Sequence, residues 1–262
     1  MQDLQLAILQ ADLSWENPEN NLAYFTKKIM ALSNKVDVIV LPEMFTTGFS
    51  MNAKHLAEPT NGKSLSWMKS MANEKQACVT GSLIIEEKGK YYNRLYWVFP
   101  DETFKTYDKK HLFTLAKEQQ TYTAGNEKLI VEYQGWKFCP LICYDLRFPV
   151  WARNIEDYDV LLYVANWPEI RTSAWDALLK ARAIENMCYC VGVNRVGKDG
   201  NDYPYSGHSG VYNALGDLMT KSENHHQVFS EIHTLNHEVL EKTRSKLGFL
   251  KDRDTFKISS AN

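Results

Sequence analysis

Residues 139–149 read CPLICYDLRFP, an apolar run that carries one thiol, Cys143, into a turn. An acid, an arginine and a proline follow the turn. A near-continuous apolar run is typical of a strand that is covered on both faces of its sheet. A cysteine at the end of such a strand is either a small apolar filler or a nucleophile placed where a pocket opens. The motifs in the rest of the sequence distinguish between these two interpretations.

Comparable runs recur along the chain and predict an α/β fold. We predict strands at residues 4–11, 36–42, 77–85, 92–99, 137–143, 159–166 and 188–194. Apolar residues at helical spacing predict helices at residues 17–34, 62–76 and 172–187. The first of these begins with Asn17 as its N-cap and Pro18 at its first helical position. Strands that alternate with helices indicate an α/β protein.

Two stretches break this alternation. Residues 91–109 predict two strands joined by a turn, and residues 206–232 contain the hairpin signal ALGD between short β-rich runs. We therefore expect mixed sheets. Neither an internal repeat nor a Pro/Ser-rich linker is present, so we expect a single domain over residues 1–262. Its core is expected at about 4–245, and a polar tail follows from about 247.

The composition is ordinary for a soluble globular protein. Hydrophobic residues make up 44% of the 262 residues and charged residues 24%. A chain of this length buries a large core without disulfides or metals. The net charge of −2 indicates neither nucleic acid nor an anionic membrane as a partner. The N-terminus lacks the pattern of a secretion signal, and no apolar run is long enough to span a membrane.

The cysteines indicate a reducing compartment. Their number is odd, none forms a CxxC pair, and each lies in an apolar context. They are Cys78, Cys139, Cys143, Cys188 and Cys190. We therefore expect a cytoplasmic protein. The sequence shows no set of histidines and cysteines at the spacing of a metal site, so we predict neither a metal nor an organic cofactor.

Polar residues end several of the predicted strands. Glu43 ends VDVIVLPE, Cys143 ends KFCPLIC, and Asn166 ends DVLLYVAN. Ligand sites of α/β sheets gather at the carboxyl ends of strands, so these residues are candidates for one shared site. In YDKKHLF (107–113), Lys109 and Lys110 follow another β-rich run. Because successive side chains of a strand face opposite ways, only one of the two lysines can point into that site.

Each residue alone has an ordinary structural explanation. A single strand-end cysteine is usually a buried filler, and Glu43 alone is more often a turn or cap carboxylate. Lys109 alone is more often a solvated surface lysine, and His111 a hydrogen-bonded structural group. The motifs taken singly therefore predict no more than a soluble α/β domain.

The motifs taken together resemble the nitrilase superfamily, the carbon–nitrogen hydrolases. The resemblance runs through LPEMFTTGF (41–49), YDKKHLF (107–113), CYDLRFP (143–149), ANWP (165–168), ARAIEN (181–186) and SGHSGVYNALGD (206–217). It covers nearly the whole chain and implies a four-layer α-β-β-α sandwich, which usually pairs with another subunit through its outer helices. The finer resemblance is to the bacterial omega-amidase branch, which hydrolyses the side-chain amide of 2-oxoglutaramate. GHSG (207–210) and the tail KLGFLKDRD (246–254) depart from the expected pattern, which leaves the oligomeric state and the substrate rim open.

The resemblance implies that the catalytic glutamate, lysine and cysteine are Glu43, Lys109 and Cys143. It also implies a supporting glutamate at Glu118. These residue types suit amide hydrolysis, because a thiol with a pKa near 8.5 is mostly protonated at neutral pH and needs a base or a positive neighbour. Glu43 can serve as the base. Lys109 favours the thiolate and, with the backbone N–H of Tyr144, can stabilise an oxyanion.

The expected substrate is a 2-oxo dicarboxylic acid monoamide, which carries one carboxylate. Arg147 and Arg171 are the candidates to bind that carboxylate, although each could instead form a structural ion pair. The candidate walls of a small pocket are Phe45, Phe113, Tyr144 and Trp167, each of which could instead be an ordinary core residue.

Three alternatives stay open at this point. The same Glu-Lys-Cys triad could serve a nitrilase, an N-carbamoyl amidase or a general aliphatic amidase. From another class, the chain could be an inactive nitrilase-like scaffold that binds a ligand. A papain-like Cys/His enzyme would require His111 to be the base.

Overall fold

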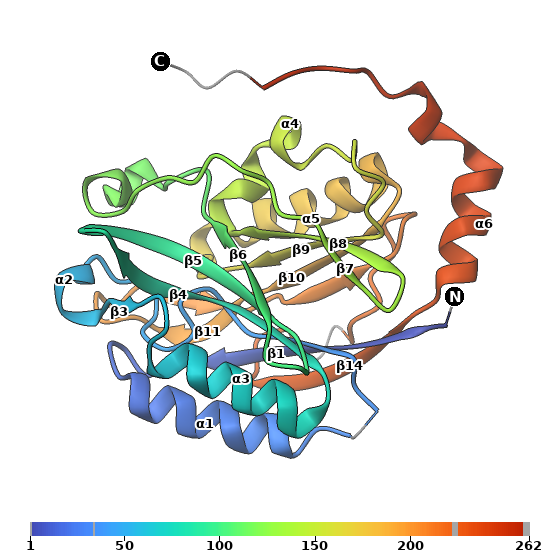
Figure 1. The fold of residues 1–262 in the computed structure, drawn as a ribbon. Helices are drawn as coiled ribbons and strands as arrows, with labels where there is room; N and C mark the ends of the chain where they lie inside the picture. Colours follow the sequence, from blue (N-terminus) through green and yellow to red (C-terminus); the bar gives the residue numbers. More distant parts are fainter. Residues whose placement is uncertain (1, 34, 222–224, 259–262) are drawn as a thin grey trace.

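Two β-sheets packed face to face form the centre of the computed structural model, which describes residues 2–33, 35–221 and 225–258 (Figure 1). Within these residues, one sheet has nine strands and the other has five. The larger sheet contains β1 (Leu4–Asp12), β2 (Val38–Val40), β3 (Glu58–Pro59), β4 (Cys78–Glu87), β5 (Lys90–Val98), β6 (Phe104–Asp108), β11 (Arg195–Lys198), β12 (Pro204–Ser206) and β14 (Phe229–Leu235). The smaller sheet contains β7 (Val131–Tyr133), β8 (Trp136–Ile142), β9 (Val160–Val164), β10 (Tyr189–Val193) and β13 (Gly210–Tyr212).

Helices cover the outer faces of both sheets. In Figure 1, α1 and α3 lie against the larger sheet, and α5 lies against the smaller one. The helices are α1 (Pro18–Met30), α2 (Ala53–Leu56), α3 (Lys63–Lys75), α4 (Pro149–Ala152), α5 (Thr172–Asn186) and α6 (His237–Leu247). The layers therefore run helix, sheet, sheet, helix, which confirms the predicted four-layer α-β-β-α sandwich.

Strand β1 is apolar on both of its faces because each face packs into a different core. Its Leu4, Leu6 and Ile8 belong to the core between the sheets, whereas Ala7 and Leu9 belong to the core beneath α1 and α3. Successive side chains of a strand point to opposite faces, so burial of both faces requires a continuous apolar run.

The predicted elements are present with small shifts at their ends, and both sheets are mixed. The three strands β8, β9 and β10 are parallel, while β7 and β13 pair antiparallel at the edges. In the larger sheet β1, β2 and β4 are parallel, and β4, β5 and β6 form an antiparallel meander. Asn17 caps α1 by accepting from the backbone N–H of Asn20. Several elements were not predicted, among them α2, β3, β7, β11 and α6, as well as β14, which pairs with β1.

Candidate active site

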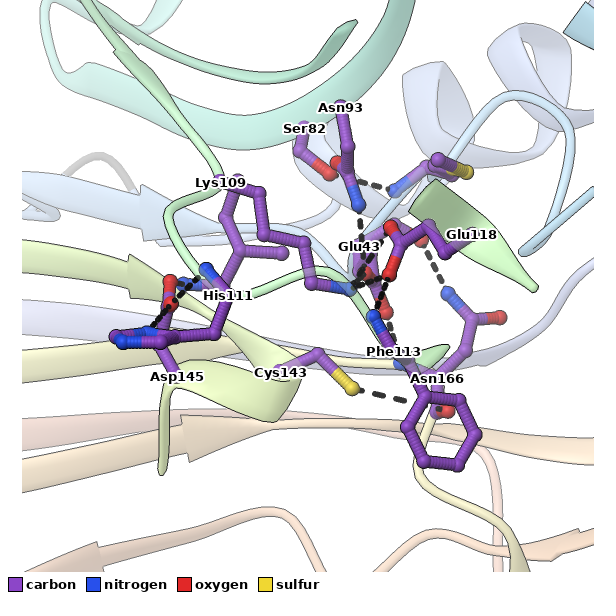
Figure 2. Close-up of polar contacts among 12 residues, drawn as sticks. Glu43, Ser82, Asn93, Lys109, His111, Phe113, Glu118, Cys143, Asp145 and Asn166 are labelled. Atoms are coloured by element: carbon purple, nitrogen blue, oxygen red, sulfur yellow. Dashed lines mark hydrogen bonds and ion pairs between the residues drawn. The ribbon is translucent and has the colours of Figure 1, made fainter. Parts of the chain in front are cut away.

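The three residues proposed for catalysis follow strands of two different sheets. Glu43 comes three residues after β2, Lys109 directly follows β6, and Cys143 directly follows β8. Strands β2 and β6 belong to the larger sheet and β8 to the smaller one. The structure therefore brings these residues together at one end of the sandwich, between the two sheets (Figure 2).

Glu43 is fully buried, and donors hold both of its carboxylate oxygens. Oε1 accepts from Asn93 Nδ2 at 2.7 Å and from Lys109 Nζ at 3.0 Å. Oε2 accepts from the backbone N–H of Asn166 at 2.8 Å. A buried carboxylate held by three donors keeps one orientation, which suits a base that must act in a defined direction.

Lys109 is fully buried between two glutamates. Its Nζ donates to Glu43 Oε1 and to both carboxylate oxygens of Glu118, each at 3.0 Å. Burial lowers the pKa of Lys109, but the carboxylates of Glu118 and Glu43 outweigh burial and raise that pKa above its usual value. The lysine therefore stays positively charged at neutral pH.

Glu118 is held from the backbone as well as by the lysine. Burial raises the pKa of its carboxyl, while the charge of Lys109 opposes that effect. The backbone N–H of Phe113 also donates to Glu118 Oε2. Glu118 thus links the loop that follows β6 to the ammonium of Lys109.

The neighbouring lysine points elsewhere. The ammonium of Lys110 lies 5.5 Å from the ring centroid of Trp151, and Lys110 does not line the pocket that contains Lys109. Lys109 and Lys110 therefore face different surroundings, as expected for adjacent residues at the end of a strand.

Cys143 sits at a sharp turn from β8 into the 3-10 helix η3 (Cys143–Arg147). Its φ angle is +43°, in the left-handed region that residues other than glycine rarely adopt. Its side chain is partly exposed and its thiol donates to the carbonyl oxygen of Asn166 at 3.9 Å. The strained turn presents the sulfur to the pocket at the end of the strand.

The surroundings of Cys143 favour the protonated thiol. Burial raises its pKa well above the usual value, and the carboxylate of Glu43 raises it further through its charge and a hydrogen bond. Lys109 lowers the pKa of the thiol and therefore favours the thiolate, as expected, but its effect on the pKa is smaller than the combined effect of burial and Glu43.

A pocket of about 530 Å³ opens over this cluster. Five of the residues predicted to contact substrate or support the site line it: Phe113, Tyr144, Arg147, Trp167 and Arg171. Lys109 and Cys143 also line the pocket, whereas Glu43 lies beneath it with no exposed surface. The size is within the range of ordinary small-molecule sites.

Phe45 does not form a wall of this pocket, and that prediction is wrong. Its ring packs at 5.6 Å from the rings of Phe25 and Trp67, in the core between the larger sheet and helices α1 and α3. Phe49, four residues later in the same loop, lines the pocket instead, and the ammonium of Lys109 lies 5.0 Å from its ring centroid.

Arg147 and Arg171 lie against aromatic residues of the pocket. The guanidinium of Arg147 is 5.0 Å from the ring centroid of Trp167, and that of Arg171 is 5.1 Å from the ring centroid of Phe113. In the part of the chain that the structure describes, neither guanidinium forms a salt bridge with a carboxylate. Neither arginine is therefore committed to a structural ion pair there.

Several residues at the site were not predicted. Asn93 and Asn166 bind Glu43, although only Asn166 had been noted as the end of a strand. The sequence contains only a weak indication that Asn93 is functional, namely a polar residue within a largely apolar strand. Trp15, Glu16 and Tyr205 also line the pocket and come from distant segments.

His111 is not placed to act as a base on Cys143. Its Nδ1 contacts Asp145 Oδ1 at 2.8 Å, and its ring stacks on Phe148 with centroids 3.6 Å apart. It does not line the pocket that contains the thiol. This geometry disfavours the papain-like alternative.

One further group of potential metal ligands occurs within the described ranges. Atoms of Asp159, His237 and Glu241 lie close enough to share a metal ion. The guanidinium of Arg244 already pairs with Asp159 at 2.7 Å and with Glu241 at 3.1 Å. None of these residues lines the pocket, so the group has no part in the site. None of the helices described here has the length and apolar character needed to cross a membrane.

Comparison with known proteins assigns a family to this arrangement. Residues 5–230 match the carbon-nitrogen hydrolase family. The chain is 42% identical to an omega-amidase of Escherichia coli, YafV, over 98% of this chain and 100% of that protein. It is 35% identical to a 2-oxoglutaramate amidase of Bacillus subtilis, over 82% and 85% of the two chains.

A solved structure has the same fold. A carbon–nitrogen hydrolase superfamily protein of Xanthomonas campestris, with an arsenic adduct in its active site, is 38% identical to this chain. It superimposes with a TM-score of 0.96 over 99% of this chain and 100% of its own.

Proposed function

Because this chain belongs to the carbon–nitrogen hydrolase family, an amide-hydrolysing group, we propose that it is an omega-amidase. Its substrate would be a short 2-oxo dicarboxylic acid monoamide such as 2-oxoglutaramate or 2-oxosuccinamate, and its products the 2-oxo acid and ammonia. The observation that carries this proposal is the contact of Lys109 with Glu43 and Glu118 beside Cys143, at the floor of a pocket that also holds two arginines.

The first step is attack of the Cys143 sulfur on the amide carbonyl. The site favours the protonated thiol, so Glu43 takes its proton as the carbon–sulfur bond forms. The carbonyl oxygen becomes an oxyanion, which the ammonium of Lys109 and the backbone N–H of Tyr144 stabilise. Glu43 then gives the proton to the departing nitrogen, the carbon–nitrogen bond breaks, and ammonia leaves a thioester on Cys143.

Water completes the turnover. Glu43 removes a proton from the water as it attacks the thioester, and the carbon–sulfur bond breaks to release the acid. The proton held by Glu43 returns to the sulfur, which regenerates the thiol. No cofactor enters this sequence, because protons are the only species exchanged between the enzyme groups.

Lys109 must release one bond to serve the oxyanion. An ammonium has three N–H donors, and Nζ makes three contacts at rest: one to Glu43 and two to Glu118. The bidentate contact to Glu118 can become a single bond at low cost, because the N–H of Phe113 continues to bind Glu118 Oε2. We propose that Glu118 supports catalysis in this way, as a partner that frees one donor of the lysine.

The carboxylate of the substrate would bind Arg147 or Arg171. A guanidinium held against an aromatic ring keeps its N–H edge free for a carboxylate. Trp167 and Phe113, on which the two guanidinium groups rest, would then contact the short carbon chain.

One assay tests the proposed function against its closest alternatives. Ammonia release is compared for 2-oxoglutaramate, 2-oxosuccinamate, glutamine and a simple nitrile at equal concentration. We expect the two 2-oxo acid amides to be hydrolysed with the highest kcat/KM. A preference for glutamine or the nitrile would contradict the omega-amidase proposal and leave a different amidase or nitrilase. No turnover of any amide, together with an unreactive Cys143, would favour an inactive binding scaffold.

We also propose that the protein is a single-domain, cytoplasmic homo-oligomer, at least a dimer. Thiols stay reduced in the cytoplasm, and all five cysteines are free. The outer face of α5 exposes Ile184, and the adjacent turn exposes Leu215, so a second subunit could cover this side. Light scattering after size-exclusion chromatography tests the assembly, and a monomer at micromolar concentration would contradict it.

A further inference from the structure

The buried carboxylate of Asp145 binds four donors beside the nucleophile. Oδ1 accepts from the backbone N–H of His111 at 3.0 Å and contacts Nδ1 of its ring at 2.8 Å. Oδ2 accepts from the hydroxyl of Tyr107 at 2.7 Å and from the backbone N–H of Ile142 at 3.0 Å. The Nδ1 atom of His111 is therefore placed to donate to Oδ1.

These donors flank Lys109 and Cys143. Tyr107 and His111 are the residues two positions before and two positions after Lys109. Ile142 directly precedes Cys143, and Asp145 follows it by two positions. One carboxylate therefore joins the end of β6, in the larger sheet, to the turn after β8, in the smaller sheet (Figure 2).

The hydroxyl of Tyr107 extends this connection. Besides donating to Asp145, it accepts from the backbone N–H of Lys110 at 3.2 Å and from Trp151 Nε1 at 3.1 Å. The backbone on both sides of Lys109 is thus tied to the same carboxylate, directly at His111 and through the tyrosine hydroxyl at Lys110.

The ring of His111 is fixed without touching the pocket. It lies parallel to Phe148, with 5° between the ring planes, and edge-on to Trp151 at 6.1 Å between centroids. Ring packing and the hydrogen bond to Asp145 are two separable contributions of the same side chain. That separation allows a substitution to remove one contribution and keep the other.

We propose that His111 and Asp145 are positioning residues that set the ammonium of Lys109 relative to the sulfur of Cys143. This inference rests on the proposed roles of Lys109 and Cys143. An oxyanion donor must lie within a few tenths of an ångström of its place, and an error of about 1 Å can cost about a hundredfold in rate. Because the lysine and the cysteine are anchored in different sheets, a shared buried carboxylate fixes their spacing where the two segments meet.

Two substitutions at position 111 separate the hydrogen bond from the packing. His111→Phe keeps a ring to stack on Phe148 but has no donor for Asp145. His111→Asn places an N–H near the position of Nδ1 but loses the ring. We expect His111→Phe to lower kcat by about tenfold to a hundredfold with little change in KM, since binding groups are untouched. We expect His111→Asn to restore most of that loss.

Thermal unfolding of each variant shows whether the protein is folded at the assay temperature. If His111→Phe does not fold, Tyr107→Phe replaces it, because it removes the donor to Oδ2 without altering position 111. The same selective loss of kcat is then expected. Asp176→Ala is the matched control, since it removes a histidine–aspartate contact of similar length, 2.9 Å to His208, that does not involve this network. It should leave turnover within about twofold of wild type.

Turnover of His111→Phe within about twofold of wild type would overturn the proposal. Equal losses in His111→Phe and His111→Asn would also overturn it, since packing alone would then explain the effect. If instead the wild type does not hydrolyse 2-oxo acid amides, the proposed function is wrong. In that case the variants are compared on the amide that the wild type does hydrolyse. A wrong substrate assignment can then be told apart from a wrong role for His111 and Asp145.

Discussion

Glu43 and Asn166 bind each other through two hydrogen bonds. The backbone N–H of Asn166 donates to Glu43 Oε2 at 2.8 Å, and Asn166 Nδ2 donates to the backbone oxygen of Glu43 at 2.6 Å. Glu43 follows a strand of the larger sheet, and Asn166 follows β9 of the smaller sheet. The proposed base is therefore held by the sheet that carries the proposed nucleophile, which keeps its carboxylate directed toward the thiol.

Replacement of Cys143 by alanine should abolish ammonia release, because no other thiol lies in the pocket. Cys139→Ala is the control, since Cys139 lies in β8, four residues before Cys143, and is completely buried between the sheets. We expect the control to keep most of the activity and to lose only a modest amount of stability. Ammonia release and thermal unfolding measure both effects. Substantial turnover by Cys143→Ala would show that the nucleophile is another group.

Lys109→Met should reduce kcat by about a hundredfold to a thousandfold through loss of the oxyanion donor. It should also destabilise the fold by about 3–5 kcal/mol, because Glu43 and Glu118 remain buried without their cation. A second substitution, Glu118→Gln, should recover much of that stability but none of the activity. Steady-state kinetics and denaturant unfolding separate the two consequences.

Lys110→Met is the matched control for that experiment. Its side chain lies over Trp151 and away from the pocket, so we expect kcat within a few-fold of wild type. A larger loss at Lys110 than at Lys109 would reverse the assignment of the catalytic lysine.

Glu43→Gln should make the thiolate easier to form while turnover collapses. The charge of Glu43 raises the pKa of Cys143, so its removal lowers that pKa and leaves the stabilising charge of Lys109. The rate of alkylation by iodoacetamide should therefore rise at lower pH in the variant than in the wild type. If the pH at which alkylation reaches half its maximal rate were unchanged or higher in Glu43→Gln than in the wild type, this electrostatic account would be contradicted. Amide hydrolysis retained by the variant would exclude Glu43 as the base.

The arginine that binds the substrate carboxylate should discriminate between charged and neutral amides. We expect Arg147→Met or Arg171→Met to lower kcat/KM for 2-oxoglutaramate by about tenfold to a hundredfold, the value of a hydrogen bond to a charged group. The same variant should affect hexanamide far less. Equal losses for both substrates at both positions would mean that the arginines support the fold instead.

The strand-end residues of the site were predictable because sheet geometry constrains them. Apolar runs mark the buried strands, and the residue after each run lies at an edge where ligands bind. That reasoning located Glu43, Lys109 and Cys143, and the resemblance assigned their roles. It also indicated that only one of Lys109 and Lys110 faces the site, because adjacent side chains diverge at the end of a strand, and the resemblance selected Lys109.

Side chains in loops were less predictable. Phe45 and Phe49 lie in one irregular segment without a repeating direction, so the sequence does not show which of them faces the pocket. Burial on both faces of a strand also does not reveal whether a helix or a second sheet covers it, so the family resemblance was needed to predict two packed sheets. The network around Asp145 depends on contacts between distant segments, which no local pattern records.

The placement of Glu43 and Lys109 on one sheet and Cys143 on the other has a consequence for folding. Neither sheet alone contains all three residues of the proposed site, so we expect a partly folded chain with one intact sheet to be inactive. Catalytic activity then reports on cooperative assembly of the whole sandwich. Inactivation by urea should follow the same transition as the loss of tryptophan fluorescence, and an earlier inactivation would reveal that the two sheets separate before either one unfolds.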